Sequence, residues 1–318
     1  MTIEHRTLGS NGPSVSAIGL GCNNFGREGT LTATQEGTTA VLDEAIEQGV
    51  TLLDTADIYG RTLSETFMGV ALRGRRESVV VATKFGHSQV DLGLAPGAAK
   101  GSREYIRAAL DASLTRLQTD YVDLYQLHTP DEVTPIEETI GALEELVVEG
   151  RVRYYGHSNF SAAQIADAHA TAQRMGVTGF VSAQDEYSLL ARGVERDVLP
   201  AVREVGLGFL PYFPLANGLF TGKFSRTQRP ADSRIARQRP EVAENAPWDV
   251  IEAYERFCAA RGITMLQATF GWLLAQPGLT SVIAGASKPE QIAQNAQASG
   301  AWRPDADELE TISGLFSA

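Results

Sequence analysis

Four polar side chains in the first half of the chain could together carry out redox chemistry on a carbonyl group. Asp54, Lys84 and His128 each end one of three successive apolar runs, and Tyr59 lies just beyond the first run. A tyrosine with a pKa of about 10 is a poor acid at neutral pH, but a nearby lysine ammonium lowers that pKa. An aspartate supplies the lysine with a counter-charge, and a neutral histidine can hold a carbonyl oxygen against the tyrosine. Such a group could protonate an oxyanion as hydride reduces the carbonyl, and it needs no metal ion.

Each of these residues also has an ordinary structural explanation. Asp54 or Asp57 could cap the following helix, Lys84 could be a surface lysine, His128 could bond a loop carbonyl, and Tyr59 could pack beside a turn. Four suitable residue types at successive strand ends are harder to explain by coincidence. We therefore predict a catalytic tetrad of Asp54, Tyr59, Lys84 and His128, and we expect Asp57 to have only a structural role.

The elements that must position these residues alternate along the chain between strands and helices. Eight apolar runs are expected to be strands, at 18–22, 51–56, 79–84, 122–128, 152–158, 180–184, 208–213 and 280–285. Helical periodicity is found between or after them, at about 32–48, 64–73, 102–117, 135–149, 161–174, 195–205, 248–275 and 288–298. Strands that are almost continuously apolar and alternate with helices indicate a parallel sheet covered by helices. Eight such units predict an α/β fold of the (β/α)8 TIM-barrel type.

Local signals refine this pattern. Ser64, Ser102 and Ser161 are plausible helix N-caps, and Gly49, Gly150 and Gly176 stand where helices should end. No linker-like segment divides the chain, so we predict a single domain over residues 1–318.

Two segments stand outside the repeating units. Residues 3–8 and 13–18 flank Asn11-Gly12, which predicts an N-terminal β-hairpin that could act as a lid or a plug at one end of the fold. Residues 216–247 form a long, Arg-rich polar insertion between the seventh and eighth strands. A loop of that length is usually functional or mobile, although an ordinary solvated surface loop is an equal alternative from composition.

The barrel rule places the polar residues in one region. Active sites of such barrels lie at the C-terminal ends of the strands, and side chains alternate between the two faces of a strand. Lys84 shares a face with Ala82, and His128 shares a face with Gln126. If those faces line the barrel, both side chains point into its mouth, where Tyr59 can lean over them.

Composition excludes several classes of partner. The formal net charge of −12 argues against nucleic acid or an anionic membrane as the main partner. No apolar run approaches the roughly 20 residues of a membrane span, and the N-terminus lacks a signal-peptide pattern. Cys22 and Cys258 are far apart without metal-ligand spacing, so we expect free thiols and a cytoplasmic protein. Nothing in the sequence indicates an obligate protein partner.

The ordered motifs of the chain resemble those of the aldo-keto reductases, which are NADPH-dependent (β/α)8-barrel oxidoreductases. The similarity runs from Leu8-Gly9 to about Gln297, and the pattern is most similar to the bacterial branch that also resembles potassium-channel β subunits. Its markers are Ile18-Gly19-Leu20-Gly21-Cys22, Asp54-Thr55-Ala56-Asp57-Ile58-Tyr59-Gly60, Ala82-Thr83-Lys84-Phe85-Gly86, Asp123-Leu124-Tyr125-Gln126-Leu127-His128, Gly156-His157-Ser158-Asn159-Phe160, Gln184-Asp185-Glu186-Tyr187-Ser188 and Tyr212-Phe213-Pro214-Leu215-Ala216-Asn217-Gly218-Leu219.

The resemblance implies the same tetrad, with Tyr59 as general acid, and NADPH (NADP+) as cofactor. It implies that Ser158, Asn159 and Gln184 hold the nicotinamide carboxamide and that Tyr212 stacks on the ring. The other cofactor contacts that it implies are Gly21, Cys22, Asn23, Asp54, Phe213, Pro214, Leu215, Asn217, Gly218, Lys223, Gly285, Ser287, Lys288, Gln291, Gln294 and Asn295. Among these, the backbone from Leu215 to Gly218 and Lys223 would clamp the pyrophosphate, and Ser287 with Lys288 would bind the 2′-phosphate at a helix start. The family often has arginine where Gln291 stands, which puts the sharpness of NADPH selection in doubt.

Two functions follow as hypotheses. The first is reduction of small-molecule aldehydes or ketones, with Phe25, Ile58 and His87 as walls of the substrate pocket. The second is an NADP(H)-sensing binding protein, like channel β subunits, with vestigial activity. A metal-dependent barrel hydrolase would need several His and Asp ligands at strand ends, and the chain has only five histidines.

Overall fold

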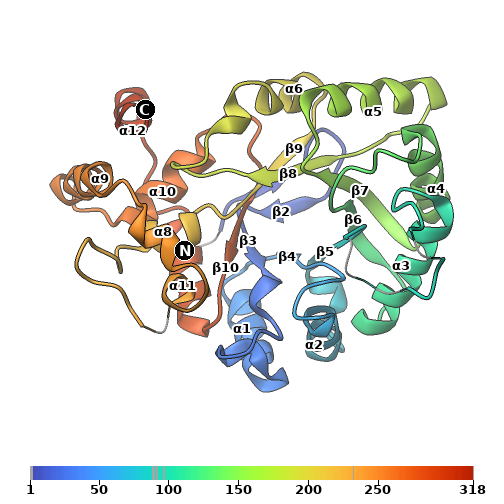
Figure 1. Ribbon diagram of the computed structural model, residues 1–318, viewed down its shortest axis with the longest axis horizontal. Helices are drawn as coiled ribbons and strands as arrows, with labels where there is room; N and C mark the ends of the chain where they lie inside the picture. The colour runs from blue at the N-terminus through green and yellow to red at the C-terminus, as the bar shows by residue number, and fades with distance from the viewer. Residues whose placement is uncertain (1–2, 88–89, 91, 96, 232, 318) are drawn as a thin grey trace.

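Eight parallel strands form the barrel expected from the sequence. The computed structural model describes residues 3–87, 90, 92–95, 97–231 and 233–317. Figure 1 shows the strands at the centre of the molecule with helices around them. The barrel strands, in their order around the sheet, are β10 (Val282–Gly285), β3 (Ile18–Gly21), β4 (Leu52–Asp54), β5 (Val80–Phe85), β6 (Val122–Leu127), β7 (Val152–Ser158), β8 (Ser182–Glu186) and β9 (Gly208–Tyr212). The seam between β9 and β10 is joined by an isolated bridge from Phe209 to Leu279, which nearly closes the barrel.

Helices follow the strands, most of them at the predicted places. They are α1 (Gln35–Glu47), α2 (Leu63–Ala71), α3 (Arg103–Leu117), α4 (Ile136–Val148), α5 (Ala162–Met175), α6 (Val198–Glu204), α9 (Trp248–Ala260), α10 (Met265–Leu274), α11 (Pro289–Ala298) and α12 (Ala306–Leu315). The prediction of a single helix over 248–275 is wrong, because the helix is interrupted between α9 and α10. Gly262 adopts a φ of +66° there, and Thr264 begins α10 with a capping box to Gln267.

The predicted helix caps are confirmed in two of three positions. Ser102 and Ser161 cap α3 and α5 through their side chains. Ser64 is not a cap but lies inside α2, where its hydroxyl donates to the carbonyl of Cys22 at 3.0 Å. This bond ties α2 to the segment that follows β3. The helix α12, which the sequence pattern did not predict, begins at Asp305 with its own capping box.

The hairpin plugs the N-terminal end of the barrel. Its strands β1 (His5–Thr7) and β2 (Ser14–Ser16) pair antiparallel. Leu8 and Val15 are fully buried and belong to the interior core of the barrel with Leu52, Ala82 and Leu124. Because the interior is filled at this end, the open end of the barrel is the one at which the strands finish.

The insertion after β9 contains short helices and packs against the body of the protein through a few buried side chains, while many of its other described residues are exposed. It contains the 3-10 segment η5 (Ala216–Thr221) and the short helices α7 (Arg234–Gln238) and α8 (Pro240–Glu244). Phe220 and Ile235 are buried in the outer hydrophobic core. Both cysteines are free and buried, and no helix among the described residues is long and apolar enough to cross a membrane.

One buried histidine on β7 is surrounded by aromatic rings. His157 is fully buried, stacks on Phe160 with ring centroids 4.3 Å apart and lies edge-on to Phe180. Neither ring nitrogen has a hydrogen-bond partner among the described groups. Burial lowers the pKa of His157 to about 3, so the ring is neutral at physiological pH.

We expect His157→Phe to weaken the acid sensitivity of folding. The folded pKa lies below the unfolded value of about 6.5, so wild-type stability is lost as pH falls from about 6.5 towards 3. Between pH 7.5 and 5 the variant should gain roughly 1–2 kcal/mol relative to wild type. Urea unfolding across this pH range measures the free energy of unfolding of both proteins. The other titrating groups are the same in both, so their contributions cancel in the difference. Parallel stability curves would contradict the expectation.

Candidate active site

The C-terminal ends of β4, β5 and β6 bring the predicted tetrad together. Asp54 is the last residue of β4, and Lys84 lies one residue before the end of β5. His128 follows β6 directly, and its backbone N–H donates to Phe85 O at 2.8 Å. Tyr59 lies in the turn between β4 and α2 and leans over the barrel mouth, at the floor of a cavity of about 870 Å³.

Lys84 and Asp54 form a buried ion pair at the centre of the site. The Lys84 Nζ donates to Asp54 Oδ1 and Oδ2 at 2.8 and 2.7 Å and to Thr55 O at 2.9 Å. It also lies 3.4 Å from the hydroxyl of Tyr59. Burial acts to lower the pKa of Lys84, but the negative charge of Asp54 and the contact with Tyr59 outweigh it and raise the pKa. The lysine is therefore a fixed positive charge beneath Tyr59.

The pKa of Tyr59 does not follow the expectation from its lysine neighbour alone. Burial raises this pKa above 10, and the nearby charge of Asp54 acts in the same direction. Lys84 lowers it, as expected, but does not outweigh burial. Tyr59 is consequently protonated at neutral pH, which is the form that a general acid requires.

His128 faces Tyr59 as a neutral ring. The two ring centroids are 5.9 Å apart and the planes are nearly perpendicular. Burial and the positive charge of Lys84 lower the pKa of His128 to about 3. A second histidine, His87, lies with its ring centroid 5.4 Å from that of His128. A neutral imidazole beside a protonated phenol provides two donors for one carbonyl oxygen.

Two glutamines support Asp54 from inside the barrel. Gln184 Nε2 donates to Asp54 Oδ1 at 2.9 Å, and Gln126 Nε2 lies 3.4 Å from the same oxygen. Gln184 was predicted only as a cofactor contact, and no role was predicted for Gln126. A role for Gln126 at the site could have been predicted, because Gln126 shares the inward face of its strand with His128.

Asp57, the second carboxylate of the motif, lies apart from the site. It is fully buried, neither carboxylate oxygen has a partner among the described groups, and it does not line the cavity. Burial, reinforced by Glu65, raises the pKa of Asp57 to about 7. Its backbone N–H donates to Lys84 O at 3.1 Å, which joins the tyrosine turn to β5.

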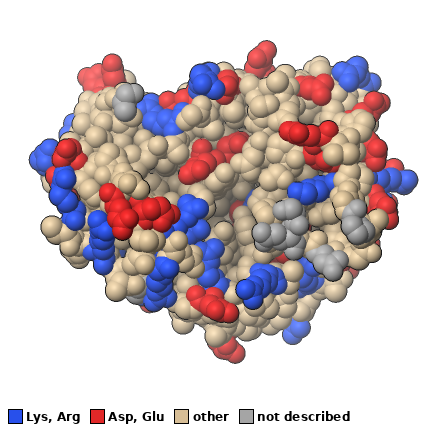
Figure 2. Space-filling view, in the orientation of Figure 1, with Lys and Arg blue, Asp and Glu red and all other residues tan. Residues whose placement is uncertain are grey.

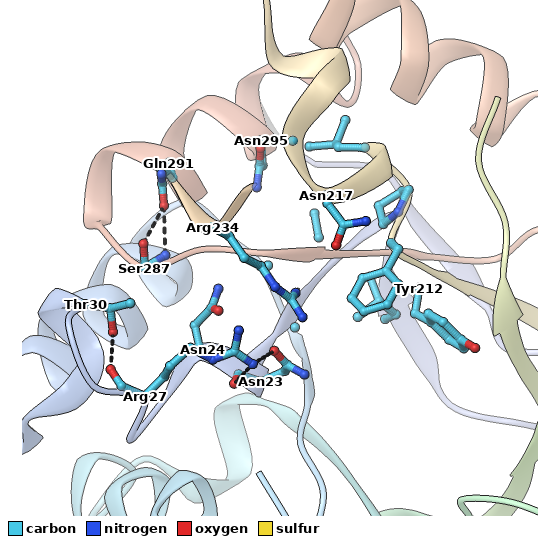
Figure 3. A pocket seen from close by; sticks show the side chains of 18 of the residues that line it. Asn23, Asn24, Arg27, Thr30, Tyr212, Asn217, Arg234, Ser287, Gln291 and Asn295 are labelled. Atoms are coloured by element: carbon cyan, nitrogen blue, oxygen red, sulfur yellow. Dashed lines mark hydrogen bonds between the residues drawn. The ribbon is translucent and has the colours of Figure 1, made fainter. Parts of the chain in front are cut away.

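On the opposite side of the mouth, the ends of β7, β8 and β9 are linked by side chains. Ser158 Oγ donates to Gln184 O at 2.7 Å. Asn159 Nδ2 donates to His128 O at 3.0 Å, and its Oδ1 accepts from the hydroxyl of Tyr212 at 2.9 Å. These bonds hold the aromatic ring of Tyr212 at the edge of the cavity (Figure 3).

The far end of the cavity lies between η5 and the start of α11. Asn217 and Gly218 have φ values of +61° and +111°, and the buried side-chain oxygen of Asn217 has no partner among the described groups. At the start of α11, Gln291 Oε1 accepts from the backbone N–H of Ser287 at 2.8 Å and from its hydroxyl at 3.3 Å. Figure 3 shows Asn217, Ser287, Gln291 and Asn295 around this part of the pocket. The long cavity thus connects the tetrad to a helix N-terminus, which favours negative charge.

The structure brings nearly all of the predicted site residues to this one cavity. Those that line it are Gly21, Asn23, Asp54, Ile58, Tyr59, His87, His128, Ser158, Asn159, Gln184, Tyr212, Phe213, Pro214, Leu215, Asn217, Gly218, Lys223, Gly285, Ser287, Lys288, Gln291, Gln294 and Asn295. Lys84 lies beneath it, and Cys22 and Phe25 do not reach it. Both are fully buried in the outer core, because the segment after β3 turns these side chains inward.

Three arginines that were not among the predicted site residues line the cavity: Arg27, Arg234 and Arg237. The Arg-rich character of the insertion was a signal for Arg234, whereas nothing in the local sequence singled out Arg27. Within the described part of the chain, no group of three or more His, Cys, Asp or Glu side chains could hold a metal ion.

Comparison with known proteins adds a family assignment. The model of the family described as "Aldo/keto reductase family" matches residues 17–316. A probable voltage-gated potassium channel subunit beta of Oryza sativa subsp. japonica is 34% identical over 309 residues, which cover 93% of this chain and 91% of that protein. The uncharacterized oxidoreductase YrpG of Bacillus subtilis (strain 168) is 38% identical over 305 residues, covering 93% and 91%. A probable aldo-keto reductase 1 of Glycine max is 35% identical over 297 residues, covering 92% and 83%.

Proposed function

The chain belongs to the aldo/keto reductase family of oxidoreductases, and from this premise we propose that it reduces aldehydes or ketones to alcohols with NADPH. The observation that carries the proposal is the contact of a protonated tyrosine with a buried, paired lysine and a neutral histidine. This combination donates a proton to an oxygen and stabilises the charge left behind, as reduction of a carbonyl requires.

The residues at the cavity suit a dinucleotide. The cavity of about 870 Å³ extends from Tyr59 to the N-terminus of α11, and Asn217, whose side-chain oxygen has no partner among the described groups, lines the space between. We assign Ser158, Asn159 and Gln184 to the nicotinamide carboxamide and Tyr212 to the ring face. The assignments for the remaining groups are η5 with Lys223 for the pyrophosphate, Ser287 with Lys288 for the 2′-phosphate, and Gln294 with Asn295 for the adenine.

NADPH bound in this position would supply hydride to the carbonyl carbon. Tyr59 then gives its hydroxyl proton to the carbonyl oxygen, so that a C–H and an O–H bond form as the C=O double bond becomes single. His128 donates a hydrogen bond that orients the oxygen before transfer. Lys84, held by Asp54, stabilises the tyrosinate that remains.

A side-by-side assay tests the proposal. Purified protein is mixed with NADPH or NADH and a panel of aldehydes and ketones, and nicotinamide absorbance is followed. Loss of absorbance with stoichiometric alcohol formation supports the reductase. Tight NADPH binding without turnover of any carbonyl would instead favour an NADP(H)-sensing protein, a candidate suggested by the 34% identity to the channel beta subunit relative.

Cofactor preference should respond to Gln291. Its side-chain oxygen accepts hydrogen bonds from the backbone N–H and the hydroxyl of Ser287. These are the donors that a 2′-phosphate would use. Gln291→Arg should release these donors and add a positive charge, raising the NADPH-to-NADH ratio of kcat/KM by about tenfold. Gln291→Glu, of nearly the same shape, should lower the ratio. The same NADPH-to-NADH ratio of kcat/KM in wild type and both variants would mean that the 2′-phosphate binds elsewhere.

A further inference from the structure

The loop after β3 lies directly against the turn that carries Tyr59. The α-carbons of Gly26 and Gly60 are so close that a Cβ on Gly60 would come within 3.1 Å of the α-carbon of Gly26. A Cβ on Gly26 would lie 3.3 Å from the Gly60 backbone. Arg27 follows Gly26 and lines the cavity, so its position is set beside that turn.

Among the described residues, the hydrogen-bond partners of the Arg27 guanidinium are neutral groups. It donates to the side-chain and backbone oxygens of Asn23 at 2.6 and 3.2 Å and to Gln238 Oε1 at 3.0 Å. These bonds use three of the five N–H donors of an arginine, and no carboxylate pairs with Arg27 among the described residues. Glu28 also lines the cavity, but it forms no ion pair with Arg27 within the described part of the chain. Arg27 is thus a fixed cation with spare donors at the cavity wall.

Arg234 provides a second cation in the same space. It lies over the ring of Phe213 at 5.1 Å from the centroid, and Figure 3 shows its guanidinium near Asn23 and that of Arg27. It has no carboxylate partner among the described residues, and its Nε is buried without a partner. Burial, followed by repulsion from Arg27 and Arg239, lowers the pKa of Arg234 to about 10. Two like charges held this close favour an anion in the cavity.

The two arginines belong to different walls. Arg234 comes from the insertion that also supplies Asn217, Gly218 and Lys223, the proposed pyrophosphate clamp. Arg27 comes from the loop against the Tyr59 turn, where a carbonyl compound must approach. Basic side chains, together with acidic ones, border the hollow in the middle of the face in Figure 2, although the whole protein carries a formal charge of −12.

We propose that Arg27 binds an anionic group of the substrate, so that the enzyme prefers carbonyl compounds that carry a carboxylate. This inference rests on the proposed reductase function and names the substrate class of the same site. A charged guanidinium with remaining donors can give a charge-assisted hydrogen bond to a carboxylate, and its existing bonds to Asn23 and Gln238 reduce the ordering needed when the substrate binds.

Matched substrates test the role of the charge. We suggest 3- and 4-carboxybenzaldehyde, each compared with the neutral carbamoylbenzaldehyde of the same shape, with NADPH as reductant. In wild type the acid of at least one pair should have the higher kcat/KM. In Arg27→Gln this acid-to-amide ratio should fall by about 10- to 100-fold, as expected for loss of a charge-assisted hydrogen bond. Arg61→Gln, which removes an exposed positive charge that does not line the cavity, should keep the wild-type ratio.

Two binding measurements separate the possible failures. NADPH affinity, followed by protein fluorescence, should be similar in Arg27→Gln and wild type. A loss of NADPH affinity with an unchanged acid-to-amide ratio would mean that Arg27 binds the cofactor, and it would overturn the proposal. Calorimetric titration of terephthalate into the NADP+ complex should show binding that Arg27→Gln weakens. If no aldehyde is reduced, the reductase function fails, and this titration still decides whether Arg27 binds a carboxylate. Equal kcat/KM values for the acid and the amide of both pairs in wild type would also overturn the proposal.

Discussion

Tyr59→Phe should lower kcat for aldehyde reduction by about 1,000-fold or more while leaving NADPH bound. The substitution removes the proton donor, and positioned general acids contribute about 10²- to 10⁴-fold to rate. The phenyl ring can keep the position of the tyrosine ring, so the cavity wall and its approach to His128 are retained. Steady-state kinetics and NADPH fluorescence titration measure the two parts of this expectation.

A second tyrosine provides the matched control for this substitution. Tyr155 donates its hydroxyl to Glu144 at 2.6 Å on the outer side of β7, away from the cavity. Tyr155→Phe removes the same atom from another partly enclosed hydroxyl and should keep wild-type kcat. Turnover of simple aldehydes at the wild-type rate by Tyr59→Phe would exclude Tyr59 as the general acid.

Lys84→Met should reduce both stability and activity. Asp54 would remain buried with only the amides of Gln184 and Gln126 as donors. Removal of one partner from a buried ion pair costs about 3–5 kcal/mol, because the other charge is left uncompensated. Reduction should fall by at least about 100-fold, since the tyrosinate formed on proton transfer loses its neighbouring cation.

The double variant Asp54→Asn/Lys84→Met separates folding from chemistry. It removes both buried charges, so urea unfolding should show that most of the lost stability returns. Activity should not return, because no cation lies beneath Tyr59. Recovery of turnover together with stability would mean that Lys84 acts only as a structural residue.

The sequence by itself determined the architecture and predicted four polar residues that the structure brings together at the ends of neighbouring strands. Near-continuous apolar runs alternating with helical periodicity are local signals, and eight of them in order specify a barrel that is confirmed by the strand order. Strand alternation then placed Lys84 on the inward face of its strand. Over 248–275 the helical periodicity continued through a helix boundary, and the capping box at Thr264 marks the start of a second helix there.

Only the tertiary structure decided which neighbours these residues have and how they titrate. The bond from Gln184 to Asp54 spans 130 positions, and the bond from Arg27 to Gln238 spans 211. Phe25, two residues before Arg27, turns into the core, and burial raises the pKa of Tyr59 despite its lysine neighbour. Packing and desolvation depend on segments that meet only when the barrel closes. The sequence could therefore single out Asp54, Tyr59, Lys84 and His128 as candidates, whereas Arg27 and the pKa direction of Tyr59 required the folded chain.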